Sequence, residues 1–88
     1  MDPLDRLAQA LAVEPTTPSE TSEILTVARD VAHTIERRIT PVSTYLLGIS
    51  VERRVAAGAP RDDALAAALA DMRGAMPEPP EEPSQPTG

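Results

Sequence analysis

The chain of 88 residues contains no cysteine, no tryptophan, no phenylalanine and no lysine. Without thiols it can form neither a disulfide nor a thiolate zinc site, and it has no cysteine nucleophile. Because Tyr45 is its one aromatic residue, the core must be aliphatic, and nucleic acid bases find no stacking platform. An apolar run long enough to cross a membrane is also lacking, and the acidic start is unlike a signal peptide. We therefore expect a cytoplasmic protein without a membrane partner.

The net charge of −6 disfavours nucleic acid as a partner, because phosphate binding depends on clustered basic side chains. All eight basic residues are arginine, which together with ten prolines and many alanines suggests a high-GC bacterial genome. A chain of this length buries only about 60% of the surface that it exposes when unfolded. Its stability is then marginal, and the surface of a partner would supplement it.

The composition changes abruptly at Pro77, where the sequence becomes PEPPEEPSQPTG. Proline and glutamate at this density cannot form a packed core and favour extended, solvated conformations. The sequence therefore predicts one helical domain over residues 1–76 and a disordered tail over residues 77–88.

Proline punctuates four expected helices, each of which begins with a proline where the missing N–H does no harm. The first would run from its cap Asp2 to about Val13, and the second from its cap Thr17 to about residue 38 or 39. Thr17 and Glu20 have the spacing of a capping box. The positions expected to be buried are Leu4, Leu7, Ala8 and Leu11 in the first helix, and Ile24, Val27, Ala28, Val31 and Ile35 in the second.

The third expected helix, from about Pro41 to Ala57, carries apolar residues around more than one narrow stripe, which predicts the central and most buried element. We expect Thr40 to cap it, because proline disfavours the helical conformation for the residue before it. Gly58 would end it, and the fourth helix would follow from about Pro60 to Ala75. The apolar residues of these two helices are Val42, Tyr45, Leu46, Leu47, Ile49, Val51 and Val55, and Leu65, Leu69, Met72 and Met76. The pattern predicts an all-α, compact four-helix bundle.

The most distinctive polar group lies on the second helix around His33, the only histidine. A helical wheel places His33 opposite Ile24, Val31 and Ile35, and it places Arg29, Asp30 and Arg37 on its own side. One interpretation is a solvated face with ion pairs between neighbouring turns. The other is a partner-binding surface of these four residues, since arginine and histidine beside a carboxylate make directional, charge-assisted hydrogen bonds.

Other kinds of site find little support in the sequence. A single histidine without thiolates does not complete a zinc site, and the glycines form neither GxGxxG nor a P-loop. Hydrogen bonding at a helix end explains Ser43 and Thr44 better than nucleophilic catalysis. Gly48, inside the third helix, costs about 1 kcal/mol relative to alanine, and close helix packing explains it better than a ligand contact. We expect no catalytic residue, no cofactor and no metal.

The segments PLDRLAQAL, ILTVARDVAHTIERRITPVSTYLLGI and GAPRDDALAAALADM together resemble a small actinobacterial helical domain family of uncharacterised function. Members of that family are stand-alone proteins, and they are similar to domains fused to, or encoded next to, molybdenum cofactor guanylyltransferases. The resemblance covers roughly residues 2–76 and brings no catalytic residues with it. It implies an accessory role beside a nucleotidyltransferase.

The sequence leaves two hypotheses for the function. In the first, the chain is a non-enzymatic interaction or accessory module that presents Arg29, Asp30, His33 and Arg37 to a protein partner, such as a nucleotidyltransferase. In the second, it is a structural homo-oligomer that buries aliphatic surface of its third or fourth helix against a copy of itself.

Overall fold

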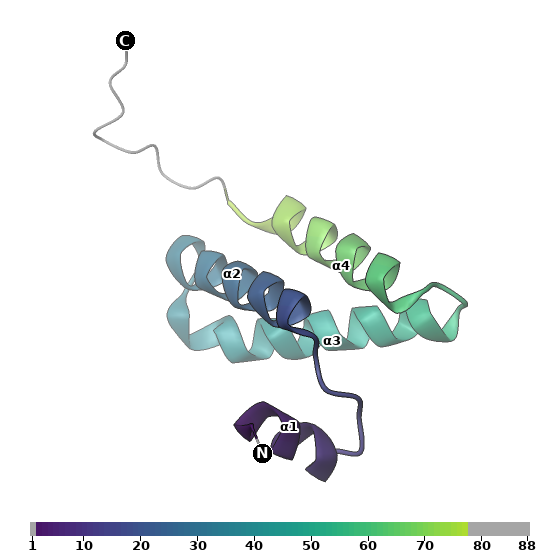
Figure 1. Ribbon diagram of the computed structural model, residues 1–88. Helices are drawn as coiled ribbons and strands as arrows, with labels where there is room; N and C mark the ends of the chain where they lie inside the picture. The colour runs from purple at the N-terminus through teal and green to yellow at the C-terminus, as the bar shows by residue number, and fades with distance from the viewer. Residues whose placement is uncertain (1, 78–88) are drawn as a thin grey trace.

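The structure, a computed structural model, describes residues 2–77. Its helices are α1 (Pro3–Ala10), α2 (Pro18–Thr34), α3 (Thr40–Ala56) and α4 (Arg61–Ala75), and the short 3₁₀ helix η1 (Arg37–Ile39) precedes α3 (Figure 1). Within this range the backbone forms no β-strand, so the predicted all-α bundle is confirmed. The tail predicted over residues 77–88 lies, apart from Pro77, outside the described residues.

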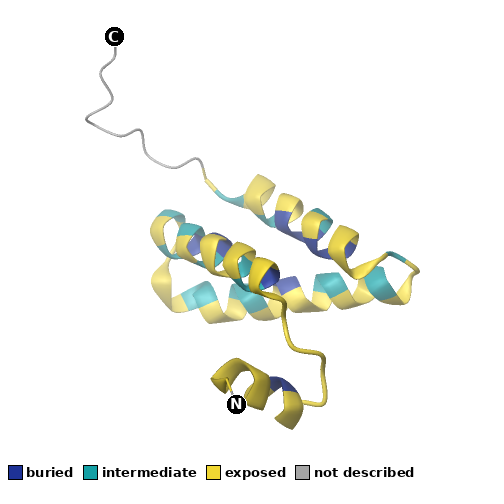
Figure 2. Ribbon diagram, viewed as in Figure 1, coloured by how far each residue is buried: buried dark blue, intermediate teal, exposed yellow. Residues whose placement is uncertain are grey.

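Helix α3 is the central element, because it packs against both α2 and α4. The core is a cluster of Val27 from α2, Leu47 from α3, and Leu65, Ala68 and Leu69 from α4. Ile24, Val51, Met72 and Met76 pack around this cluster, so the predicted seam of α4 is confirmed. The expectation that α3 is also the most buried helix is wrong. Leu47 is its one buried residue, whereas α4 buries four, since no helix among residues 2–77 packs over the outer side of α3 (Figure 2).

The start of α2 is as the sequence predicts. The side chain of Thr17 accepts a hydrogen bond from the backbone N–H of Glu20 at 3.1 Å, and a carboxylate oxygen of Glu20 accepts one from the N–H of Thr17 at 2.9 Å. Both halves of the capping box are therefore present. The stripe that follows is largely confirmed, because Val27 and Val31 are fully buried.

The junction between α2 and α3 differs from the prediction. Helix α2 ends at Thr34, four to five residues earlier than expected, and Glu36 is extended with φ −166° and ψ 135°. Thr40 does not cap α3 but is its first residue, with φ −54° and ψ −48° and no side-chain cap. Pro41 is tolerated in the first turn of α3, where no backbone N–H is needed. The interruption between α2 and α3 therefore lies before Thr40 and not at Thr40. Ile35, beyond the end of α2, is consequently exposed.

Helix α1 stands apart from the other three (Figure 1). It is shorter than predicted and ends at Ala10, and Ala12 follows in the left-handed region with φ 57°. Ala8 is buried, but the expectation that Leu4, Leu7 and Leu11 join the core is wrong, because these side chains are exposed. A helix of eight residues places few side chains against its neighbours, and Ala8 is the one residue of α1 that is buried.

Candidate interaction surfaces

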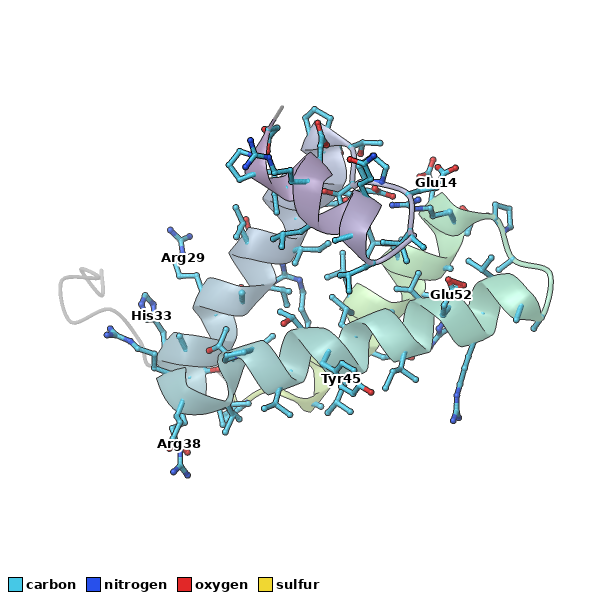
Figure 3. All side chains as sticks on the ribbon, turned by 90° about the horizontal axis from the view of Figure 1, so that it is seen from below. Glu14, Arg29, His33, Arg38, Tyr45 and Glu52 are labelled. Carbon is cyan, nitrogen blue, oxygen red and sulfur yellow. The ribbon has the colours of Figure 1, made fainter. Side chains whose placement is uncertain are left out.

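The residues predicted from the sequence as a partner-binding surface lie where α2 turns into α3. Arg29 and His33 are exposed on α2, and Arg37 is exposed in η1. Figure 3 shows Arg29 and His33 extending outward at the same end of the molecule as Arg38, whereas Glu14 and Glu52 lie toward the other end. We call Arg29, His33 and Arg37 the basic corner.

Asp30 does not belong to this corner in the way the sequence suggested. Its carboxylate accepts a hydrogen bond of 2.8 Å from Nη1 of Arg73, and thereby joins α2 to α4. No hydrogen bond or ion pair between Asp30 and His33 occurs among residues 2–77. Of the four predicted residues, three are thus exposed, and the fourth is engaged with a neighbouring helix.

Three other arginines make ion pairs between elements, whereas the two of this corner make none within residues 2–77. Arg54 pairs with Asp71, Arg61 with Glu20, and Arg73 with Asp30, each across two elements. Within the described part of the chain, no carboxylate lies at ion-pair distance from Arg29 or Arg37. These two guanidinium groups are therefore available to carboxylates outside the described residues.

A second polar cluster joins the start of α4 to the start of α2 and to the loop before α2. The sequence indicated only part of it. Nε and Nη2 of Arg61, at the start of α4, each donate a 2.9 Å hydrogen bond to the carboxylate of Glu20. Nη2 also lies 3.4 Å from the carbonyl oxygen of Pro15, and Nη1 lies 3.8 Å from Glu14. The capping box identified Glu20, but no local signal pointed to Arg61, which is 41 residues away. This arrangement positions the start of α2 against α4.

The hydroxyl groups that the sequence offered as nucleophiles are engaged with the backbone. Ser43 Oγ donates to the carbonyl of Thr40 at 2.7 Å, and Thr44 Oγ1 donates to the carbonyl of Pro41 at 2.8 Å. The interpretation of these two residues as helix-end hydrogen bonders is confirmed. Ser50 Oγ instead accepts a hydrogen bond of 3.3 Å from Nε of Arg54.

Residues 2–77 contain neither a metal-binding cluster nor a helix that could span a membrane. No group of three or more histidine or acidic side chains is arranged to hold a metal ion there. Likewise, none of the four helices in this range combines the length and the apolar character that crossing a bilayer requires.

The outer side of α3 carries an exposed apolar surface. Val42 and Leu46 are each 58% exposed, and Tyr45 is 69% exposed. Beside this surface, Leu11 and Val13 face α3 across an open groove of about 730 Å³. The sequence predicted these α3 residues as core, because the spacing of apolar residues cannot tell which arc of a helix has a neighbour.

Comparison with known proteins gives a family but no described relative. Neither the curated proteins nor the solved structures contain a significant match to this chain. A family model described as a domain of unknown function, DUF6457, matches residues 2–83 and thus nearly the whole chain. Its range includes all four helices and continues beyond the domain end at residue 76 that the composition suggested. On this match, the chain belongs to the DUF6457 family of uncharacterised domains.

Proposed function

We propose that this protein is a non-enzymatic interaction module that works in the cytoplasm by binding another protein. The observation that carries the proposal is the balance between its core and its surface. Among residues 2–77, ten large apolar side chains are exposed, whereas only five residues larger than alanine are both apolar and buried. Contiguous exposed apolar surface on a small domain is typical of protein–protein contact.

The basic corner would select the partner. Arginine side chains that lack an intramolecular carboxylate make charge-assisted, bidentate hydrogen bonds with carboxylates of another protein. His33 adds a planar hydrogen-bonding group to this exposed surface. We therefore expect the partner to present an acidic surface to Arg29, His33 and Arg37.

The family that the sequence resembles suggests a candidate protein partner. It points to a molybdenum cofactor guanylyltransferase in an actinobacterial host, to which this chain would be an accessory subunit. The exposed leucines of α1 lie outside the packed helices and offer a second, apolar contact for such an enzyme.

Calorimetric titration of the purified guanylyltransferase from the same genome tests this assignment. We expect binding by the natural chain, and a loss of about tenfold in affinity when Arg29→Ala and Arg37→Ala are combined. Arg6→Ala is the matched control, because Arg6 is an exposed arginine on α1 without an ion pair among residues 2–77. Absence of binding by the natural chain would remove the guanylyltransferase as partner. Equal weakening by the control would remove the basic corner as the contact surface.

A further inference from the structure

The exposed residues of α3 follow a seven-residue repeat. Val42, Ile49 and Ala56 are spaced by seven and form one row along the helix. Residues 45 and 52 flank this row on one side and residues 46 and 53 on the other, since each residue advances the helix by about 100°. All of them are exposed, and together we call them the α3 stripe: Val42, Tyr45, Leu46, Ile49, Glu52, Arg53 and Ala56.

This pattern is the one by which two helices pack along their length. In parallel pairs, apolar residues that repeat every seven residues face each other, and β-branched side chains such as valine and isoleucine are favoured at one of the two core positions. Here the central row holds Val42 and Ile49 and then the small Ala56. Within residues 2–77 no other helix packs over this row.

We propose that two copies of this chain associate through their α3 stripes, with the two α3 helices side by side and parallel around a twofold axis. In this arrangement Val42, Ile49 and Ala56 each face the same residue of the second copy. Tyr45 of one copy packs against Leu46 of the other on both sides of the row. The contact is isologous, as a closed dimer requires.

Charge complementarity identifies a second copy as the occupant of this surface and sets the direction of the helices. Glu52 and Arg53 are exposed on opposite flanks of the row, and neither has an ion pair among residues 2–77. A parallel twofold places Glu52 of each copy beside Arg53 of the other, which gives two ion pairs. An antiparallel pair centred on Ile49 brings Glu52 beside Tyr45 and Arg53 beside Leu46, so neither charge meets an opposite one.

The groove beside the stripe is compatible with this contact. Leu11 and Val13 line its far wall, and Tyr45, Ile49 and Ala56 line the wall formed by α3. A second α3 helix on the stripe covers the exposed apolar side of α3 and borders these two side chains. The additional burial supplements a core in which Val27 and Val31 are the largest fully buried side chains.

Sedimentation equilibrium of the full chain, from micromolar to millimolar concentration, tests the association. We expect the mass to rise from 9.3 kDa toward that of a dimer. Ile49→Asp, on the twofold axis, should keep the chain monomeric at every concentration with unchanged helical circular dichroism. Leu25→Asp is the matched control, because Leu25 is a 63% exposed residue on α2 outside the stripe, and this variant should dimerise normally.

The ion pairs have a test of their own. Glu52→Arg and Arg53→Glu, made separately, should each weaken the dimer, because each places like charges side by side across the twofold. The double variant restores opposite charges and should recover the affinity of the natural chain. A structural role of either residue within one copy does not produce this recovery, since neither side chain has a charged partner there.

Absence of cysteine from the chain makes the direction of the helices measurable by oxidation. Val42→Cys should form a disulfide-linked dimer in the parallel arrangement, where the two residues face each other. In the antiparallel arrangement they lie roughly 21 Å apart along the helix, beyond the reach of a disulfide. Ile49→Cys, which faces itself in both arrangements, is the positive control.

The outcomes separate this proposal from the binding of an enzyme partner. A natural chain that stays monomeric throughout, or a dimer that Leu25→Asp rather than Ile49→Asp disrupts, overturns the α3 contact. Disulfide formation by Ile49→Cys but not by Val42→Cys overturns the parallel direction. None of these results affects the titration at the basic corner, which uses other residues, and failure of that titration leaves the dimer intact.

Discussion

Nε and Nη2 of Arg61 each donate a 2.9 Å hydrogen bond to the carboxylate of Glu20, so that the first turn of α4 holds the first turn of α2. The Glu20 side chain is only 7% exposed, whereas that of Arg61 is 40% exposed. The acid is thus withdrawn from water and depends on this partner and on the N–H of Thr17.

Arg61→Ala should therefore lower the free energy of unfolding by about 1 to 3 kcal/mol, because it leaves a buried carboxylate without its main partner. Urea denaturation followed by circular dichroism measures this loss. Arg73→Ala is the control, since it breaks an ion pair whose side chains are 45% and 37% exposed and should cost less than about 1 kcal/mol. Equal losses in the two variants would contradict the special position of Glu20.

The two glycines at α3 should respond in opposite directions to alanine. A Cβ built on Gly48 meets no heavy atom within 4 Å in the described residues, so Gly48→Ala should stabilise the helix by about 1 kcal/mol. Gly58 has φ 110°, where a side chain is strained, so Gly58→Ala should destabilise by about 1 to 2 kcal/mol. Thermal unfolding of both variants at one protein concentration checks the signs. A destabilised Gly48→Ala would mean that close packing explains this glycine after all.

Thr40→Val should leave the stability unchanged or raise it by about 1 kcal/mol. The hydroxyl of Thr40 is buried, and within residues 2–77 it has no hydrogen-bond partner, so replacing it with a methyl group removes an unpaired polar atom. Thr44→Val is the matched control, because it removes a hydroxyl that donates to Pro41 at 2.8 Å. Denaturant midpoints of the two variants should move apart, and a shared loss of stability would show that Thr40 does contribute a helix-end hydrogen bond.

The leucines of α1 and α4 should differ sharply in their contribution to stability. Leu69 is 6% exposed in the core cluster, and Leu69→Ala should cost about 2 to 5 kcal/mol. Leu7 is 60% exposed, and Leu7→Ala should change the stability by less than about 0.5 kcal/mol. Chemical denaturation of both variants gives the comparison. A large loss from Leu7→Ala would place α1 in the folded core.

Where the chain carries local signals, the sequence predicts the structure correctly. Thr17, Pro18 and Glu20 specify the start of α2 through groups no more than three residues apart, and Gly58 marks the end of α3. The aliphatic seam of α4 was likewise readable, because Leu65 and Leu69 lie one turn apart.

The wrong predictions concern which helices contact one another. The leucines of α1 have the same spacing as a buried stripe, and only the position of α1 beside the bundle reveals that they are exposed. The partners of Asp30 and Glu20 lie 43 and 41 residues away in α4, so no spacing within a helix indicates them. At the basic corner, the sequence correctly predicts that His33 is exposed, but it misplaces Asp30 for this reason.

The exposure of Tyr45, the chain's one aromatic residue, decides what its intrinsic fluorescence can report. Since Tyr45 is already 69% exposed in the folded chain, unfolding changes the environment of its ring little. Tyrosine emission therefore changes little when the core unfolds. A second molecule that covers the outer side of α3 changes this emission directly. The protein thus carries a built-in optical probe of contact rather than of folding.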